Sequence, residues 1–143
     1  MSLTYSQLLN LIRSCSHLKK LVISCDVWCD SIICDSVFRQ LSVCCKNLRH
    51  LSLCPGSFDS TDSSLDSLSS LPALRSVSFT GFPAFSELAF IRFIRNSKAL
   101  NNCYIEDCFP MTQTFIDCLL LVFKGLESLV LQKSIINKLF SIF

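Results

Sequence analysis

The sequence predicts an α/β solenoid, with a short parallel β-sheet on the concave face of a curved array and helices on its convex face. One apolar phrase supports this fold class: a leucine with apolar or cysteine residues three and five positions later. It recurs five times, at residues 18–23, 48–53, 74–79, 100–105 and 126–131. By subtraction, the first residues of the copies lie 30, 26, 26 and 26 positions apart. Between the copies, polar loop residues precede apolar residues at helical spacing.

The third unit shows the pattern most clearly. Hydroxyl residues at 76, 78 and 80 alternate with Val77 and Phe79, which predicts a strand with its apolar side chains on one face. A loop with Gly81 and Pro83 follows, and the helical spacing then begins, with apolar residues at Phe85, Phe90, Phe93 and Ile94. One unit is therefore strand, turn and helix. An LxxLxL phrase with a period of about 20–29 residues is characteristic of leucine-rich repeats.

The other units follow the same order. Residues 1–17 read as half of an earlier repeat, and repeats start near 18, 48, 74, 100 and 126, so we expect a single domain over 1–143 that is a fragment of a longer array. The helix residues expected to face inward are Leu8, Leu11, Ile12 and Cys15; Val37, Phe38, Leu41 and Cys44 or Cys45; Leu65, Leu68 and Leu71; Phe115, Ile116, Leu119, Leu120 and Phe123.

Polar residues just before each helix are suited to capping its free N–H groups. They are Asp35, Asp62 with Thr61, and Glu87, while Thr112 is a better cap than Gln113 in the fourth unit. At the other end, the last repeat is expected to leave an uncapped apolar flank that makes the chain associate. This flank consists of Ile135, Ile136, Leu139, Phe140, Ile142 and Phe143.

Composition restricts the class of protein. Half of the 143 residues are hydrophobic, 17% are charged, and the mean hydropathy is +0.48, but no apolar run reaches the ~18 residues that cross a membrane. The N-terminus lacks the pattern of a signal peptide, so the ten cysteines are expected to be reduced thiols in the cytoplasm or nucleus. A net charge of +2, even with the Lys19-Lys20 pair, does not indicate a nucleic-acid partner.

Catalytic and metal-binding patterns are weak. Cys25, Cys29 and Cys34, with His17 upstream, lack the paired CxxC spacing of zinc sites, so we expect no metal. His50 and Cys54 lie on one strand face, but residues four apart in a strand are about 13 Å apart, too far for a nucleophile and its base. Phosphate loops and hydrolase motifs are missing. We therefore expect neither an enzyme nor a bound cofactor.

Four aromatic residues fall in the turns after the strands: Trp28, Phe58, Phe82 and Phe109. They could form a hydrophobic rim that contacts a partner. Alternatively they stack beneath the array as part of its core, which we favour for the three phenylalanines, while both interpretations remain open for Trp28.

The strand residues between the inward-facing ones are expected to form the concave surface and to bind a protein. Most are small and polar, and Lys20, His50, Tyr104 and Glu106 have the reach to carry specificity. The alternative is a face that is merely solvated. The full set is Lys20, Val22, Ser24, His50, Ser52, Cys54, Ser76, Ser78, Thr80, Asn102, Tyr104, Glu106, Ser128, Val130 and Gln132.

Two stretches suggest a narrower relationship. Residues 44–53 read CCKNLRHLSL and residues 61–68 read TDSSLDSL, echoed by ICDSVFRQL at 33–41. They resemble the cysteine-containing 26-residue repeats of F-box/leucine-rich-repeat proteins, with Cys15 and Cys45 three residues before a strand leucine and Cys108 after a strand. Repeats three and four depart from the pattern, since they lack the first cysteine and Cys103 replaces a strand leucine.

The resemblance implies the substrate-recognition region of an SCF-type ubiquitin-ligase subunit, whose partner would be a ubiquitination substrate. No F-box is apparent in the sequence, so the cullin-ligase adaptor is not expected to bind this chain. The alternative is a structural or regulatory repeat scaffold with no ubiquitin-ligase link.

Overall fold

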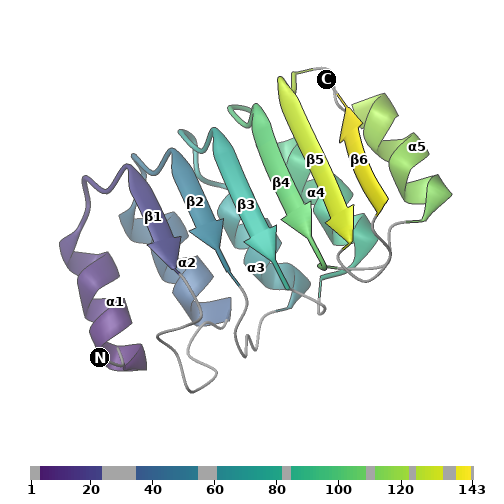
Figure 1. Ribbon diagram of the computed structural model, residues 1–143. Helices are drawn as coiled ribbons and strands as arrows, with labels where there is room; N and C mark the ends of the chain where they lie inside the picture. The colour runs from purple at the N-terminus through teal and green to yellow at the C-terminus, as the bar shows by residue number, and fades with distance from the viewer. Residues whose placement is uncertain are drawn as a thin grey trace.

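The computed structural model describes residues 4–23, 35–54, 61–81, 85–108, 112–122, 125–133 and 138–142, with only the backbone at 133 and 138–142. Helices and strands alternate along these ranges as far as residue 133, and a second strand follows at 138–142 (Figure 1). The elements are α1 (Tyr5–Ser14), β1 (Lys20–Ile23), α2 (Asp35–Cys44), β2 (His50–Leu53), α3 (Asp62–Ser69), β3 (Ser76–Thr80), α4 (Glu87–Asn96), β4 (Asn102–Glu106), α5 (Gln113–Val122), β5 (Ser128–Lys133) and β6 (Lys138–Ile142).

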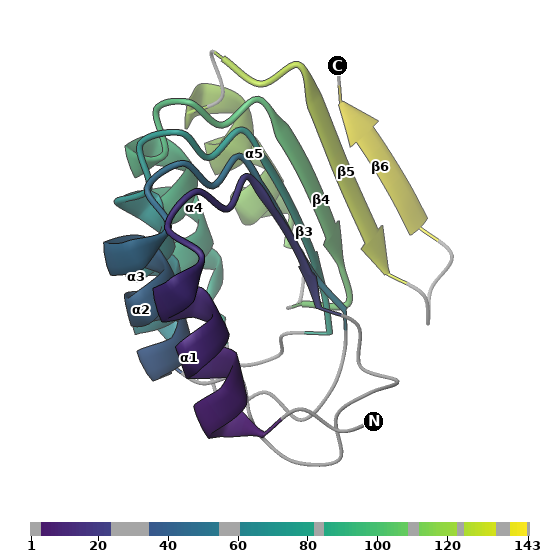
Figure 2. The same ribbon diagram turned by 90° about the vertical axis from the view of Figure 1, so that its left-hand side faces the viewer.

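The strands form one sheet in the order β1-β2-β3-β4-β5-β6, and neighbours from β1 to β5 are parallel. A helix connects each parallel strand to the next, and the helices lie together on one side of the sheet (Figure 2). Each strand from β1 to β5 begins two residues after the first leucine of a phrase. The predicted α/β alternation and the predicted strand positions are therefore confirmed.

The core lies between the sheet and the helices, because each phrase directs alternate residues to the same side. In register, Leu51 pairs with Val77, Val77 with Cys103, and Cys103 with Leu129, and all four are buried. Burying a side chain of this size stabilises a fold by roughly 1.5–3 kcal/mol. The cysteine that replaces a strand leucine at 103 thus keeps the role of a small apolar core residue.

Phenylalanines connect the layers in the middle of the array. The Phe79 ring on β3 lies 6.0 Å from that of Phe85 and 6.2 Å from that of Phe93 on α4, measured between ring centroids. Phe90 lies 6.1 Å from Phe115, which joins α4 to α5. These side chains are all buried. Phe85, expected within the helical part of its unit, lies just before α4 instead.

Two expected core residues are exposed. Leu11 on α1 is 49% exposed and Leu120 on α5 is 53% exposed, although Leu8, Ile12, Phe115 and the other described members of the expected set, apart from the half-buried Cys15 and Cys44, are buried. Among the helices of the described ranges, α1 packs only against α2, and α5 only against α4. Because each has a helix neighbour on one side only, part of its apolar surface is left uncovered. The remaining expected residue, Phe123, lies outside the described residues.

The predicted caps need a correction. Asp62 and Glu87 are the first residues of α3 and α4, and the caps are Thr61 and Ser86, whose hydroxyls accept N–H groups of the first turn. Asp35 likewise is the first residue of α2. Thr112 is confirmed as the better cap of α5, because its hydroxyl accepts the Phe115 N–H at 3.2 Å.

The three carboxylates have a different task, which is to tie each helix to the next. Asp62 accepts both the backbone N–H (2.8 Å) and the hydroxyl (2.7 Å) of Ser86. Asp35 does the same for Thr61, and Glu87 does the same for Thr112. We call these contacts the cap ladder. It aligns the N-terminal ends of α3, α4 and α5 with the preceding helix.

The region after β5 also differs from the expectation of an uncapped last repeat. The backbone of β6 pairs with β5 in an antiparallel register, from Lys133↔Lys138 to Leu129↔Ile142. The outer edge of β5 is therefore hydrogen-bonded rather than open. Side chains at 139, 140 and 142 are not described, and Ile135, Ile136 and Phe143 lie outside the described residues.

Candidate functional site

The strand residues predicted to form a binding surface lie on the side of the sheet opposite the helices, which we call the open face. The parallel register places them in rows across the strands. The first row is Lys20, His50, Ser76, Asn102 and Ser128; the second is Val22, Ser52, Ser78, Tyr104 and Val130; the third contains Thr80, Glu106 and Gln132. Cys54 follows the end of β2, and Ser24 lies outside the described residues. Their binding role stays a prediction.

The open face is hollowed over β1, β2 and β3. A depression of about 370 Å³ is lined there by Lys20, Leu21, Val22, His50, Leu51, Ser52, Ser76 and Ser78. Val22 is 56% exposed, although it lies in the middle of a strand. Serine hydroxyls both donate and accept hydrogen bonds. This part of the face therefore combines an accessible apolar spot with small groups that can bond to a peptide backbone.

The opposite end of the open face, where the strands end, is rich in hydrogen-bond acceptors. The Tyr104 hydroxyl lies 3.0 Å from Glu106 Oε2 and 3.1 Å from Gln132 Oε1, and it can donate to either. Partial burial raises the pKa of Tyr104, and the hydrogen bond and negative charge of Glu106 raise it further. The phenol thus stays protonated near neutral pH and can donate its one proton to Glu106 or to Gln132.

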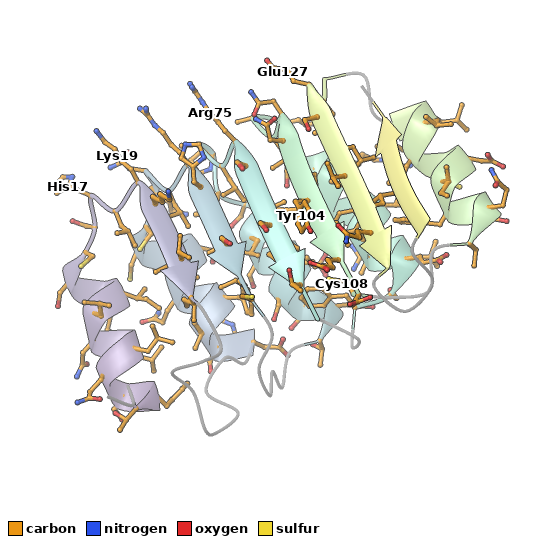
Figure 3. All side chains as sticks on the ribbon, in the orientation of Figure 1. His17, Lys19, Arg75, Tyr104, Cys108 and Glu127 are labelled. Carbon is orange, nitrogen blue, oxygen red and sulfur yellow. The ribbon has the colours of Figure 1, made fainter. Side chains whose placement is uncertain are left out.

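The edge at which the strands begin carries a feature that the sequence analysis missed. Lys19, Arg49 and Arg75 each precede the first residue of a strand, and all three are exposed. Lys19 and Arg75 project from this edge in Figure 3, while Glu127 occupies the corresponding place before β5. We call Lys19, Arg49 and Arg75 the basic edge. The signal was present in the sequence as a cation after the first leucine of three successive phrases.

Backbone hydrogen bonds fix the positions of these cations. The carbonyl oxygen of Lys19 accepts the N–H groups of Arg49 (2.8 Å) and His50 (3.1 Å). The Arg49 carbonyl accepts those of Arg75 and Ser76 in the same way, at 2.9 and 3.0 Å. Each member of the basic edge is thus held one strand from the next, at a spacing of about 4.8 Å.

The buried cysteines of the described ranges are placed for packing. The Cys45 thiol lies 3.7 Å from the carbonyl oxygens of both Ile12 and Cys15, so it bonds back to the end of α1. Burial raises the pKa of Cys45, and the Cys44 and Cys15 thiols raise it further. Burial also raises the pKa of Cys103. Protonated, buried thiols are poor nucleophiles and poor metal ligands.

Other sequence candidates have mixed outcomes. Within the described ranges, no three histidine, cysteine or carboxylate side chains gather as a metal ion would require. His17 lies exposed at the edge where the strands begin (Figure 3). The remaining metal candidates, Cys25, Cys29 and Cys34, and the turn aromatics Trp28, Phe58, Phe82 and Phe109 lie outside the described residues.

The helices in the described part of the chain are all too short, or not apolar enough, to cross a membrane.

Comparison with known proteins gives likenesses of fold. No family model matches the chain, and no curated protein matches its sequence. A chain in the crystal structure of the yeast Rad7 and Elc1 complex covers 84% of this chain with a TM-score of 0.61 and 21% identity, and this chain spans 33% of it. The tropomodulin C-terminal domain of Caenorhabditis elegans covers 90% with a TM-score of 0.60 and 15% identity, and 81% of that chain is matched.

Proposed function

We propose that the chain is a leucine-rich-repeat solenoid that recognises another protein through the open face of its sheet. The observation that carries this proposal is the face itself: in-register rows of mostly small polar side chains, hollowed over β1–β3 and covered by no helix in the described part of the chain. Small side chains let a partner's backbone approach closely, and their hydroxyls can replace its lost water contacts.

Binding rather than catalysis is the role we propose. Two of the described thiols, Cys45 and Cys103, are buried and have raised pKa values. Metal analysis of the purified protein tests the opposing idea. Stoichiometric zinc that disappears in Cys25→Ser would contradict the proposal, because it would reveal a metal site among the first-loop cysteines.

A narrower form of the proposal is that the partner is a substrate of a ubiquitin ligase. Its support is the likeness of residues 44–53 and 61–68 to the repeats of F-box/leucine-rich-repeat proteins, together with the fold likeness to a chain that was solved in complex with Elc1. In this narrower proposal the chain binds the substrate, and binding of the ligase adaptor would require an F-box.

A second candidate function is a structural or regulatory scaffold with no ligase link. The specific observation in its favour is the likeness to the tropomodulin C-terminal domain, which extends over 90% of this chain and 81% of that one. Both candidates use the open face, so they differ in what happens to the bound protein.

Site-specific photo-crosslinking tests the shared part of the proposal. A photoreactive amino acid replaces Ser78, in the middle of the open face, and a matched variant carries it at Val43, which is 60% exposed on α2. We expect a discrete cellular protein to crosslink to position 78 and not to position 43. Equal labelling at both positions, or none at position 78, would contradict recognition through this face.

The same crosslinked partner then separates the two candidates. A ligase subunit predicts that a fusion of this chain to an F-box increases ubiquitination of the partner, compared with a fusion whose Ser78 is replaced by arginine. A scaffold predicts no change in ubiquitination or turnover in either fusion.

A further inference from the structure

The basic edge is not neutralised within its own part of the molecule. Segments 15–23, 45–54 and 71–81, which contain β1, β2, β3 and the turns before them, hold no aspartate or glutamate. Within the described residues, the Lys19, Arg49 and Arg75 side chains form no ion pair, whereas the exposed Arg92 on α4 pairs with Asp66 at 2.7 Å. A row of cations without counter-charges is available to an external anion.

The basic edge borders the hollow of the open face. Lys20 and His50, the first residues of β1 and β2, line that hollow and follow Lys19 and Arg49 directly in the chain. A ligand could therefore contact the cations at the edge and the Val22 spot inside the hollow at once. Of the carboxylates near the sheet, Glu127 lies at the same edge but before β5, two strands beyond β3, and Glu106 lies at the far end of β4.

We propose that the segment of the partner bound here is an acidic peptide, with its carboxylates on Lys19, Arg49 and Arg75 and a small apolar side chain against Val22. This inference rests on the proposed function, since it specifies the chemistry of the protein that the open face recognises. Arginine suits this task because its planar guanidinium can hold a carboxylate with two parallel hydrogen bonds.

The dimensions agree with a peptide. Three neighbouring strands place the outer members of the basic edge about 10 Å apart. An extended peptide that crosses the strands covers this distance with about four residues, and its alternate side chains lie about 7 Å apart. Two or three carboxylates within four residues would therefore match the row.

Single-stranded nucleic acid fits less well. Proteins that bind it combine cations with aromatic side chains on which bases stack. The residues that line the hollow include only one ring, the imidazole of His50, beside Lys20, serines and aliphatic side chains. We therefore favour the peptide and treat nucleic acid as an outcome of the test.

Fluorescence anisotropy with the purified 143-residue chain tests the proposal. The probes are a labelled peptide with four glutamates between glycine and serine residues, the same peptide with glutamines, and a single-stranded RNA of equal charge. The protein variants are Arg49→Gln combined with Arg75→Gln, and the control Arg39→Gln, which removes an exposed cation from α2 on the helical side. Circular dichroism confirms that each variant is folded.

We expect the double variant to weaken binding of the glutamate peptide roughly tenfold and the control to change it less than about twofold. Wild-type protein should bind the glutamine peptide no more tightly than the double variant binds the glutamate peptide. Added salt should weaken binding of the glutamate peptide to wild-type protein. No binding of the glutamate peptide, equal effects of the two variants, or tighter binding of RNA through Arg49 and Arg75 would overturn the inference.

Photo-crosslinking keeps this inference separate from the proposed function. A partner captured at position 78 but retained fully by the Arg49/Arg75 double variant would leave recognition by the open face intact and refute the acidic segment. Failure to capture any protein at position 78 would refute the proposed function itself.

Discussion

Ser97 occupies the place in its repeat that Cys45 occupies two repeats earlier, three residues before the leucine of the phrase. The Cys45 thiol reaches backbone oxygens of the preceding unit. Ser97 is 5% exposed, and its hydroxyl oxygen has no hydrogen-bond partner among the described residues. A hydroxyl costs more to desolvate than a thiol. Burial at this position therefore favours cysteine over serine in the free energy of folding.

We therefore expect Ser97→Ala to raise the free energy of unfolding by about 1 kcal/mol, because it removes a buried polar group that lacks a partner. Urea denaturation followed by circular dichroism measures the change. The matched control is Ser42→Ala, since Ser42 is also buried but donates to the Arg39 carbonyl at 2.7 Å. That control should be destabilised by about 0.5–1 kcal/mol. Loss of stability in both variants would refute this account of Ser97.

Asp35 predicts how stability depends on acid. Partial burial raises its pKa, but hydrogen bonds from Ser64 and Thr61 together outweigh burial, so the pKa lies below the ordinary value of 3.8. A pKa that is lower in the folded state favours the folded state wherever the unfolded carboxyl is ionised. The stabilisation by Asp35 is thus fully present above about pH 4 and is lost as the pH falls through the lower folded pKa.

We expect Asp35→Asn to be less stable than wild type at pH 7, and the difference between the two proteins to shrink as the pH falls below 3.8. Denaturation midpoints measured from pH 7 to pH 2.5 provide the comparison. Asp117→Asn on α5 serves as a control, because among the described residues its carboxylate accepts a hydrogen bond only within its own helix, from Gln113 at 2.9 Å. A constant difference between Asp35→Asn and wild type over this range would contradict the linkage.

At the scale of the elements, the cap ladder explains why the helices stand in register, including α3, which is rich in serine. Helix α3 offers a direct comparison between two aspartates. Asp62 accepts the backbone N–H and the hydroxyl of Ser86, the cap of α4, whereas Asp66 accepts two guanidinium hydrogen bonds from Arg92, at 2.7 and 2.9 Å, in an ion pair whose side chains are both almost half exposed. We expect the first contact to contribute more, because loss of Asp62 leaves the Ser86 N–H without this partner, whereas an exposed ion pair contributes about 0–1 kcal/mol.

We expect Asp62→Ala to lower the free energy of unfolding by about 1–2 kcal/mol, and Asp66→Ala by less than about 1 kcal/mol. A double-mutant cycle gives the sharper test, because it isolates the contact between helices from the propensity of α3. Asp62 and Ser86 should couple by about 1 kcal/mol, and Asp66 and Ser86 should not couple. Independent effects of Asp62→Ala and Ser86→Ala would show that the ladder adds nothing beyond capping.

The sequence predicts the repeated elements well because their signal is itself repeated. The alternation at 76–80 becomes β3, and each phrase starts a strand two residues after its leucine. The cap ladder is less visible, because its partners lie 26, 24 and 25 residues apart instead of at one fixed period. The exposure of Leu11 and Leu120 depends on which helices have neighbours, and a local pattern of apolar residues does not contain that information.

At the scale of the whole molecule, the rows of the open face follow from the alternation and the period alone, so their positions were predictable. The charge distribution was not predicted, because a net charge of +2 conceals its arrangement. Stacking the strands brings Lys19, Arg49 and Arg75 to one edge, although they are 30 and 26 positions apart in the chain by subtraction. Each of the three repeats contributes a single cation to the basic edge, and these cations become neighbours only when the chain folds.

Strand β6 determines how the sheet ends beyond β5. The repeat pattern could not predict it, because β6 runs antiparallel and comes directly after β5 in the order of the described elements. Its pairing occupies the N–H and C=O groups along the outer edge of β5. An unpaired edge strand is a template for pairing with another chain, so β6 should keep the molecule from associating through β5.

We expect deletion of residues 138–143 to convert monomers into concentration-dependent dimers or larger assemblies and to lower the urea midpoint of unfolding, because the β5 edge loses its partner strand. Sedimentation velocity at several protein concentrations measures the association. A chain that lacks only residue 143 is the matched control and should behave like wild type.

If the uncapped apolar flank predicted from the sequence dominated instead, the wild-type chain would already associate, and the longer deletion would reduce association by removing apolar residues. The sign of the change therefore separates an edge protected by β6 from an exposed apolar end.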